Sequence, residues 1–397
     1  MWYICMKVFM NENIMRNFNY YNPVRILFGK GKLSLMSRFI PAGSKVLVTY
    51  GGGSIKRNGV YDKVMEALSG YEIVEFGGIE PNPHYETLMK AVAVVKREEV
   101  DFMVAVGGGS VIDGTKFIAA AAYAGLEDSW ELVTRKSPVT GALPFGTVLT
   151  LPATSSEMNS GAVITKACTK EKLAFGSDCL FPRFSVLDPD FTFSLPLKQI
   201  ANGLVDTFVH VVEQYLVYDK AMVSDRFSEA LMRNIIELAP RVYKEERDYE
   251  AMADFMWTAT MGLNGLIACG LKGDWATHMI GHELTALHGL DHAVTLAIVL
   301  PGLMRAVKEK RNFKMAEYAH KVWGISLDEE NAANKAIART EAFFNGLNIK
   351  TELSDYGIGR DTVEEIVRRF EARLPLPVSG VEDISPAEVG QILLSVL

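Results

Sequence analysis

Short apolar runs alternate with helical patterns over the first part of the chain. Apolar and β-branched residues cluster in five segments that we expect to be strands: 25–29, 45–50, 72–76, 102–106 and 146–154. Between them, residues 59–69 and 84–100 carry apolar side chains at the spacing of an amphipathic helix. This alternation predicts βαβ units, and therefore a parallel sheet.

The pattern changes after Pro196. Residues 161–196 still hold short β-like runs, but from Leu197 onward long amphipathic or wholly apolar stretches follow, such as 198–217, 250–270 and 361–374. With 397 residues, 49% of them hydrophobic and 22% charged, the chain is long enough for two cores. We therefore predict an α/β domain over 1–196, including an N-terminal extension (1–16), and an all-helical domain over 197–397.

Two of the predicted strands end in the same tetrapeptide, GGGS. The first turn comprises Gly51, Gly52, Gly53 and Ser54, and the second comprises Gly107, Gly108, Gly109 and Ser110. Glycines between a strand and a helix let the backbone approach a phosphate, and the helix N-terminus offers free N–H groups. Neither turn fits the GxGxxG pattern of an ordinary Rossmann domain. The turns predict a phosphorylated ligand; the alternative is two tight loops that need positive φ.

The first turn also bears on the type of cofactor. An acid at the end of strand 45–50 would bind the ribose hydroxyls of NAD and repel the 2′-phosphate of NADP. The strand ends without Asp or Glu, and Lys56 follows the turn. The sequence therefore favours NADP(H).

Two further features near these turns are ambiguous from sequence. Asp113 opens the helix after the second turn, where it either contacts the cofactor or complements the helix dipole. A polar turn at 150–161 carries the hydroxyls of Thr150, Thr154, Ser155 and Ser156. This turn either contacts the cofactor or is a solvated loop.

Four of the seven histidines lie within residues 278–292. His278 and His282 are four apart, as are His288 and His292, between which Gly289 predicts a bend. Upstream, Asp206 and His210 share one face of an apolar helix, where unpaired polar groups would be costly. Asp206, His210, His278 and either His288 or His292 would make a Zn²⁺ or Fe²⁺ site with a position open to substrate. The alternative is a set of buried histidines, each satisfied separately in the core.

Composition limits the classes of partner and location. The net charge is −7 and Lys and Arg are not clustered, which argues against a nucleic-acid partner. No run reaches the roughly 18 apolar residues of a membrane span, and the N-terminus lacks the features of a signal peptide. The four cysteines are scattered, as in proteins of a reducing compartment. We therefore expect a cytoplasmic protein.

Several longer stretches carry a family resemblance. These include "YGGGSIK", "FGGIEPNP", "AVGGGSVIDGTKFIAAAA", "LTLPATSSEMNSGAVI", "ANGLVDTFVHVVEQY" and "DWATHMIGHELTALHGLDHAVTLAIVLP". The chain resembles the iron-type (group III) alcohol dehydrogenases, which share the dehydroquinate synthase-like fold. Within them it is similar to bacterial NADPH-dependent aldehyde reductases of broad substrate range and butanol dehydrogenases. Only residues 1–16 and roughly the last forty fall outside the resemblance.

The resemblance implies roles for individual residues. It assigns the metal to Asp206, His210, His278 and His292, and so favours His292 over His288. It places His282 near the nicotinamide and the substrate, with a part in proton transfer. The cofactor contacts that it implies are Gly107 to Ser110 for the pyrophosphate, Gly51 to Ser54 with Lys56 for the 2′-phosphate, and Thr150, Thr154, Ser156 and Lys172 along the groove. Ser155 departs from the family, whose close members often have Gly there. The family also implies a homodimer.

The expected activity is reversible hydride transfer between NADP(H) and an aldehyde or primary alcohol whose oxygen binds a divalent metal. A metal is expected because no Tyr-x-x-x-Lys proton donor stands out near the glycine turns. The alternatives are an NAD-dependent polyol dehydrogenase of the glycerol type, a dehydroquinate synthase of the same superfamily, and a non-catalytic NADP-binding sensor.

Overall fold

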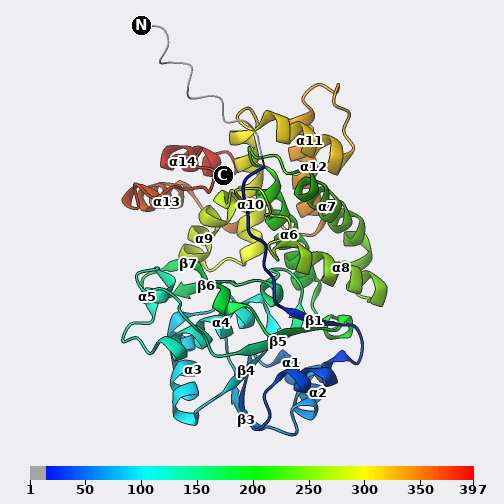
Figure 1. The fold of residues 1–397 in the computed structure, drawn as a ribbon. Helices are drawn as coiled ribbons and strands as arrows, with labels where there is room; N and C mark the ends of the chain where they lie inside the picture. Colours follow the sequence, from blue (N-terminus) through cyan, green and yellow to red (C-terminus); the bar gives the residue numbers. More distant parts are fainter. Residues whose placement is uncertain (1–14) are drawn as a thin grey trace.

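The computed structural model describes residues 15–397, so most of the predicted N-terminal extension lies outside the described residues. An α/β part lies at the bottom of Figure 1 and a helical part lies above it. Within the described residues, six parallel strands form the main sheet, in the order β1 (Arg25–Phe28), β8 (Phe184–Leu187), β5 (Phe145–Leu151), β4 (Phe102–Gly108), β2 (Lys45–Tyr50) and β3 (Glu72–Phe76). The predicted parallel sheet is confirmed.

Helices cover both faces of this sheet, because successive side chains of a strand point to opposite faces. Leu47 packs into a core shared with α3 (Tyr85–Glu98) and α4 (Gly109–Ala124). Its neighbours Val46 and Val48 belong to the opposite core, formed with η1 (Lys32–Phe39) and α2 (Val60–Ala67). Burial on both faces explains why these strands read as continuous apolar runs.

A hairpin separates the last two strands of the main sheet along the chain. Strands β6 (Gly161–Lys166) and β7 (Glu171–Gly176) pair antiparallel and form a sheet of their own. In Figure 1 they lie between the main sheet and the helical part, and β7 packs against α9 (Ala276–His288). The hairpin therefore lies between the main sheet and α9, the helix that carries His278, His282 and His288.

The second half of the described chain is helical, as predicted. It is built around α6 (Leu197–Tyr215), which is buried along almost its whole length. Around it lie α7 (Met222–Val242), α8 (Tyr249–Gly262), α9, α10 (His292–Val307), α11 (Asn312–Trp323), α12 (Ala332–Gly346), α13 (Arg360–Ala372) and α14 (Pro386–Leu394). No helix within residues 15–397 combines the length and apolar character needed to cross a bilayer.

One predicted helix is shorter than expected. The pattern over 250–270 predicts a continuous helix, but α8 ends at Gly262 and turns follow. Gly265 and Gly270 adopt positive φ values of 91° and 80°. Such values do not belong to a right-handed helix, so the glycines in this stretch override its apolar periodicity.

Candidate active site

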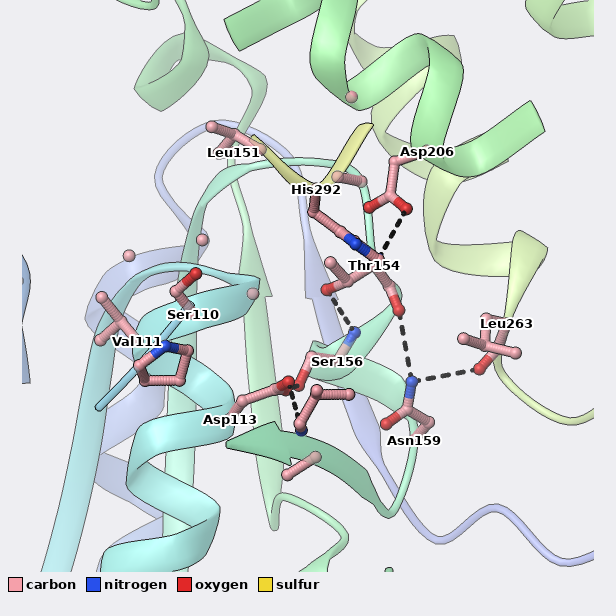
Figure 2. Close-up of a pocket in the computed structure, with 18 of the residues that line it drawn as sticks. Ser110, Val111, Asp113, Leu151, Thr154, Ser156, Asn159, Asp206, Leu263 and His292 are labelled. Carbon is pink, nitrogen blue, oxygen red and sulfur yellow. Dashed lines mark hydrogen bonds and ion pairs between the residues drawn. The ribbon is translucent and has the colours of Figure 1, made fainter. Parts of the chain in front are cut away.

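A cavity of about 860 Å³ lies between the two parts of the chain. One side of the cavity is formed by the carboxyl ends of β2, β4 and β5 and the turns after them, where ligands of open α/β sheets bind. The opposite wall comes from α6, α9 and the start of α10. Figure 2 shows one region of this wall, with Asp206 and His292 above Thr154 and Ser156.

Both glycine turns line the cavity, from Gly51 to Ser54 and from Gly107 to Ser110. Only Gly53 among these glycines has positive φ, at 84°. A Cβ at Gly107 would lie 2.6 Å from Val111 Cγ2, and one at Gly109 would lie 2.4 Å from Thr154 Oγ1. The second turn therefore needs glycine for close packing rather than for positive φ, and α4 begins directly at the cavity wall.

Lys56 differs from the other predicted cofactor contacts. It does not line the cavity, and its Nζ lies 2.9 Å from Oε2 of Glu75 on β3. Tyr50 and Tyr61 also donate hydrogen bonds to Glu75. Glu75 was not predicted, because it does not lie at the end of the preceding strand β2 but reaches Lys56 from the neighbouring strand β3.

The polar turn at 150–161 is packed against the rest of the protein and is not a solvated loop. Thr150, Thr154 and Ser156 line the cavity, while Ser155 and Ser156 are buried. Ser155 has a φ of 53°, in the left-handed region that favours glycine. Its hydroxyl donates to the Ala259 carbonyl at 2.6 Å and accepts from the Leu263 N–H at 2.8 Å. These bonds to the end of α8 hold a serine at the position where the resemblance implied glycine.

Asp113 connects the turn at 150–161 to the β6–β7 hairpin by hydrogen bonds. Its carboxylate accepts hydrogen bonds from Ser156 Oγ at 2.5 Å and from the Val163 backbone N–H at 2.9 Å (Figure 2). The side chain also lines the cavity. Both carboxylate oxygens thus have protein partners, which is a different role from complementing the helix dipole.

Lys116 belongs to the same network and was not among the predicted site residues. It is fully buried, and its Nζ donates to Ser156 Oγ, Asn159 Oδ1 and the Gly161 carbonyl at 2.7–2.9 Å. Burial lowers the pKa of Lys116 to about 8. The signal in the sequence is a lysine directly before the apolar run "FIAAAA", where a charge needs partners.

The structure brings together four of the predicted residues: Asp206, His210, His278 and His292. One potential ligand atom from each lies within 4.8 Å of the others. Asp206 and His210 project from α6, His278 lies in α9, and His292 begins α10. Burial lowers the pKa of His210 and of His278 to about 4, so both rings are neutral at neutral pH, as metal ligands must be.

These four side chains fit a divalent cation. Asp206 Oδ1, His210 Nδ1 and His278 Nε2 are buried without a hydrogen-bond partner. Such atoms are costly unless something satisfies them. One carboxylate oxygen and three imidazole nitrogens form a set of metal ligands that suits Zn²⁺ or Fe²⁺.

His282 and Lys172 lie beside this group. The His282 ring centroid is 5.5 Å from that of His292, its Nε2 is buried without a partner, and burial lowers its pKa well below the usual value. Lys172, from β7, donates to Asn82 Oδ1 at 2.8 Å and lies 3.3 Å from His292 Nδ1. Burial lowers the pKa of Lys172 to about 8. Both residues line the cavity.

His288 lies apart from the cavity. Its Nε2 is 3.0 Å from the Thr362 hydroxyl on α13. Gly289, with a φ of 69°, ends α9, and the chain then turns into α10 at His292. Of the two histidines that the residue pattern left open, the structure thus brings His292 to the group.

Glu213 is a buried residue that the sequence argument did not select. It lies on α6, three residues after His210 and seven after Asp206, and hydrogen-bonds to His278 Nδ1. Burial raises the pKa of Glu213 to about 7. The i, i+4, i+7 spacing of Asp206, His210 and Glu213 on one face of an apolar helix is the signal that could have identified it.

Comparison with known proteins agrees with this geometry. Residues 23–189 match the family described as iron-containing alcohol dehydrogenase, and residues 200–393 match the C-terminal part of the same family. The chain is 50% identical over 361 residues to the NADPH-dependent aldehyde reductase YqhD of Escherichia coli (90% of this chain, 93% of that one). It is 44% identical over 366 residues to the probable NADH-dependent butanol dehydrogenase 1 of Bacillus subtilis (90% and 94%). The crystal structure of Escherichia coli YqhD superposes with a TM-score of 0.94 at 47% identity, covering 97% of this chain and all of that one.

Proposed function

The chain belongs to the iron-containing alcohol dehydrogenase family, and on that premise we propose that it is a metal-dependent oxidoreductase that interconverts aldehydes and primary alcohols with NADP(H). One observation carries the proposal. Asp206, His210, His278 and His292 converge within 4.8 Å on the wall of the same cavity that both glycine turns line. A dinucleotide groove and a cation site that share one cavity suit hydride transfer to a polarised carbonyl.

The residues divide the work between binding and orientation. When bound, NADPH supplies the hydride and the divalent cation supplies Lewis acidity toward the carbonyl oxygen. Asp206, His210, His278 and His292 would hold the cation. The glycine turns would bring backbone N–H groups close to the cofactor phosphates. Thr150, Thr154, Ser156 and Lys172 line the same cavity and would contact the rest of the cofactor. Holding both reactants in one cavity reduces the entropic part of the barrier.

We propose that His282 carries the proton. Its buried Nε2 has no partner, and its depressed pKa keeps the ring neutral and able to accept a proton from an alcohol. In the direction of aldehyde reduction, His282 would first take up a proton from solvent at the same atom and then pass it to the alkoxide.

NADP(H) is proposed over NAD(H) because β2 ends without an acid before the first turn. The ion pair between Lys56 and Glu75 partly neutralises the positive charge near that turn. The names of relatives include both cofactors, so cofactor preference has to be measured on this chain.

The experiment is an assay of NADPH oxidation at 340 nm with butanal. Protein treated with a chelator should lose activity, and adding Zn²⁺ or Fe²⁺ should restore it. Metal-free protein that reduces butanal at the full rate would refute the metal-dependent reaction. Protein that binds NADPH and metal but leaves the absorbance flat would indicate a sensor.

Three broader features are also proposals. The boundary at 196/197 separates a dinucleotide-binding domain from a metal- and substrate-binding domain. The three described cysteines, Cys168, Cys179 and Cys269, form no disulfide, which supports a cytoplasmic location. The third proposal is that the protein is a homodimer, for which light scattering would give twice the mass of one chain.

A further inference from the structure

Glu213 connects the two helices that carry most of the ligand set. It is buried on α6, which also carries Asp206 and His210, and it reaches across to the first turn of α9. Its Oε1 accepts from the Thr277 backbone N–H at 2.6 Å and from the His278 N–H at 3.4 Å. Its Oε2 bonds to Nδ1 of the His278 ring.

The backbone contacts replace a missing local cap. The N-cap of α9 is Trp275, which has a φ of 64° and makes no side-chain cap hydrogen bond. A helix start leaves free N–H groups that need acceptors. Glu213 supplies the acceptor from another helix, and its own carbonyl accepts from the Asp274 N–H at 3.0 Å. The start of α9 is thereby fixed in position relative to α6.

The ring contact determines which nitrogen of His278 carries the proton. The two backbone N–H bonds to Oε1 favour the ionised form of Glu213. An ionised carboxylate only accepts hydrogen bonds, so the proton of this contact lies on Nδ1 of His278. Nε2 then has a free lone pair, and Nε2 is the ring nitrogen that is buried without a hydrogen-bond partner. Carboxylates that orient metal-binding histidines act in this way.

We propose that Glu213 is a positioning residue that holds His278 in the Nδ1–H tautomer, with Nε2 directed at the metal. This inference rests on the proposed function, because it assumes that His278 binds a cation. It concerns the geometry of the site and assigns Glu213 no contact with the substrate or the cofactor.

The variant Glu213→Gln changes the polarity of this contact and very little of its shape. One oxygen of Glu213 faces the Thr277 N–H and the other faces the Nδ1–H of His278. The side-chain NH₂ of glutamine would therefore face one of these two donors in either orientation. With the NH₂ at the ring, Nδ1 must accept and the proton moves to Nε2, which then cannot bind a metal. The matched control is Glu229→Gln, since Glu229 is also buried in the helical part but bonds to the Tyr215 hydroxyl.

The first measurement is the tautomer of His278 in metal-free protein labelled with ¹⁵N-histidine, by long-range ¹H–¹⁵N correlation. The His278 signals are assigned by their loss in His278→Ala. The wild type and Glu229→Gln should show the Nδ1–H form, and Glu213→Gln should show the Nε2–H form or a mixture. A wild type that carries the proton on Nε2 overturns the proposal, whether or not any variant folds.

The second measurement is Zn²⁺ affinity by competition with a chelator. Glu213→Gln should bind Zn²⁺ about 10–100-fold more weakly than the wild type, the usual effect of losing such a partner, and Glu229→Gln should match the wild type. Equal affinity of Glu213→Gln and wild type overturns the positioning role while leaving the proposed function intact. A wild type that binds no Zn²⁺ or Fe²⁺ defeats the proposed function itself, and the positioning role with it.

Discussion

The Nε2 atom of His292 lies 3.8 Å from Oδ1 of Asp206, although the first residue begins α10 and the second lies within α6. Asp206 is buried, and this oxygen has no hydrogen-bond donor. Neutral imidazoles surround it, because burial lowers the pKa values of His210, His278 and His292. Burying a carboxylate oxygen without a hydrogen-bond donor costs free energy, and a cation bound by Asp206 and the three histidines would offset that cost.

The first prediction follows from that charge. Asp206→Asn removes the only anionic ligand of the proposed set, so the purified protein should lose its metal. Its kcat/KM for butanal should fall at least about 100-fold, since Lewis-acid stabilisation contributes several kcal/mol. Elemental analysis checks the loss of metal, and the NADPH assay checks the fall in kcat/KM. His288→Ala should retain metal and activity, because His288 bonds to Thr362 outside the cavity.

The second prediction concerns cofactor choice. The kcat/KM of the wild type with NADPH should exceed that with NADH by at least about tenfold, because no acid ends β2 to repel the 2′-phosphate. Lys56→Ala should lower this ratio about fivefold, the effect of the roughly 1 kcal/mol of an exposed ion pair. Glu75→Gln, which leaves Lys56 unpaired, should raise the ratio. Equal use of the two cofactors by the wild type would refute the argument.

The third prediction tests the buried network below the cofactor groove. Lys116→Met leaves Ser156, Asn159 and the Gly161 carbonyl without their donor. The free energy of unfolding should fall by about 3 kcal/mol, as for a broken buried polar network. Urea unfolding measures the loss. Lys90→Met, at an exposed position on α3, should stay within about 0.5 kcal/mol of the wild type.

The fourth prediction is how the difference in unfolding free energy between wild type and Lys116→Met depends on pH. The pKa of Lys116 is lowered from 10.5 to about 8 in the folded protein by burial. Between these values the unfolded chain binds the proton that the folded chain has lost, so raising the pH favours folding. The stability of wild type relative to Lys116→Met should therefore rise from pH 8 to pH 10, by up to about 1.4 kcal/mol per pH unit. A difference that is constant or falls over this range would contradict the assignment.

The sequence predicted the features that depend on local pattern. Short apolar runs that alternate with helical patterns predicted a parallel sheet, and the four-residue spacing of Asp206 and His210 predicted one shared helix face. The two glycine turns predicted a site for a phosphorylated ligand, and both turns line the cavity. The structure adds that Gly109 is needed for its contact with Thr154, a pairing between distant segments that no local pattern contains.

Other features depend on which segments meet in space. The residue pattern alone could not choose between His288 and His292, because the choice depends on the direction of the chain after Gly289. Glu75 was missed because it approaches the first turn from a neighbouring strand. Glu213 was visible as a polar position on α6, but its partner His278 lies on another helix, so its role required the packing of α6 against α9.

The most direct test of the central claim is X-ray absorption at the zinc edge of protein loaded with one equivalent of Zn²⁺. The account predicts scattering from three imidazole rings with Zn–N distances of about 2.0–2.1 Å, together with oxygen ligation that changes in Asp206→Asn. A zinc environment that contains sulfur, that has fewer than three imidazoles, or that is the same in wild type and Asp206→Asn would contradict it.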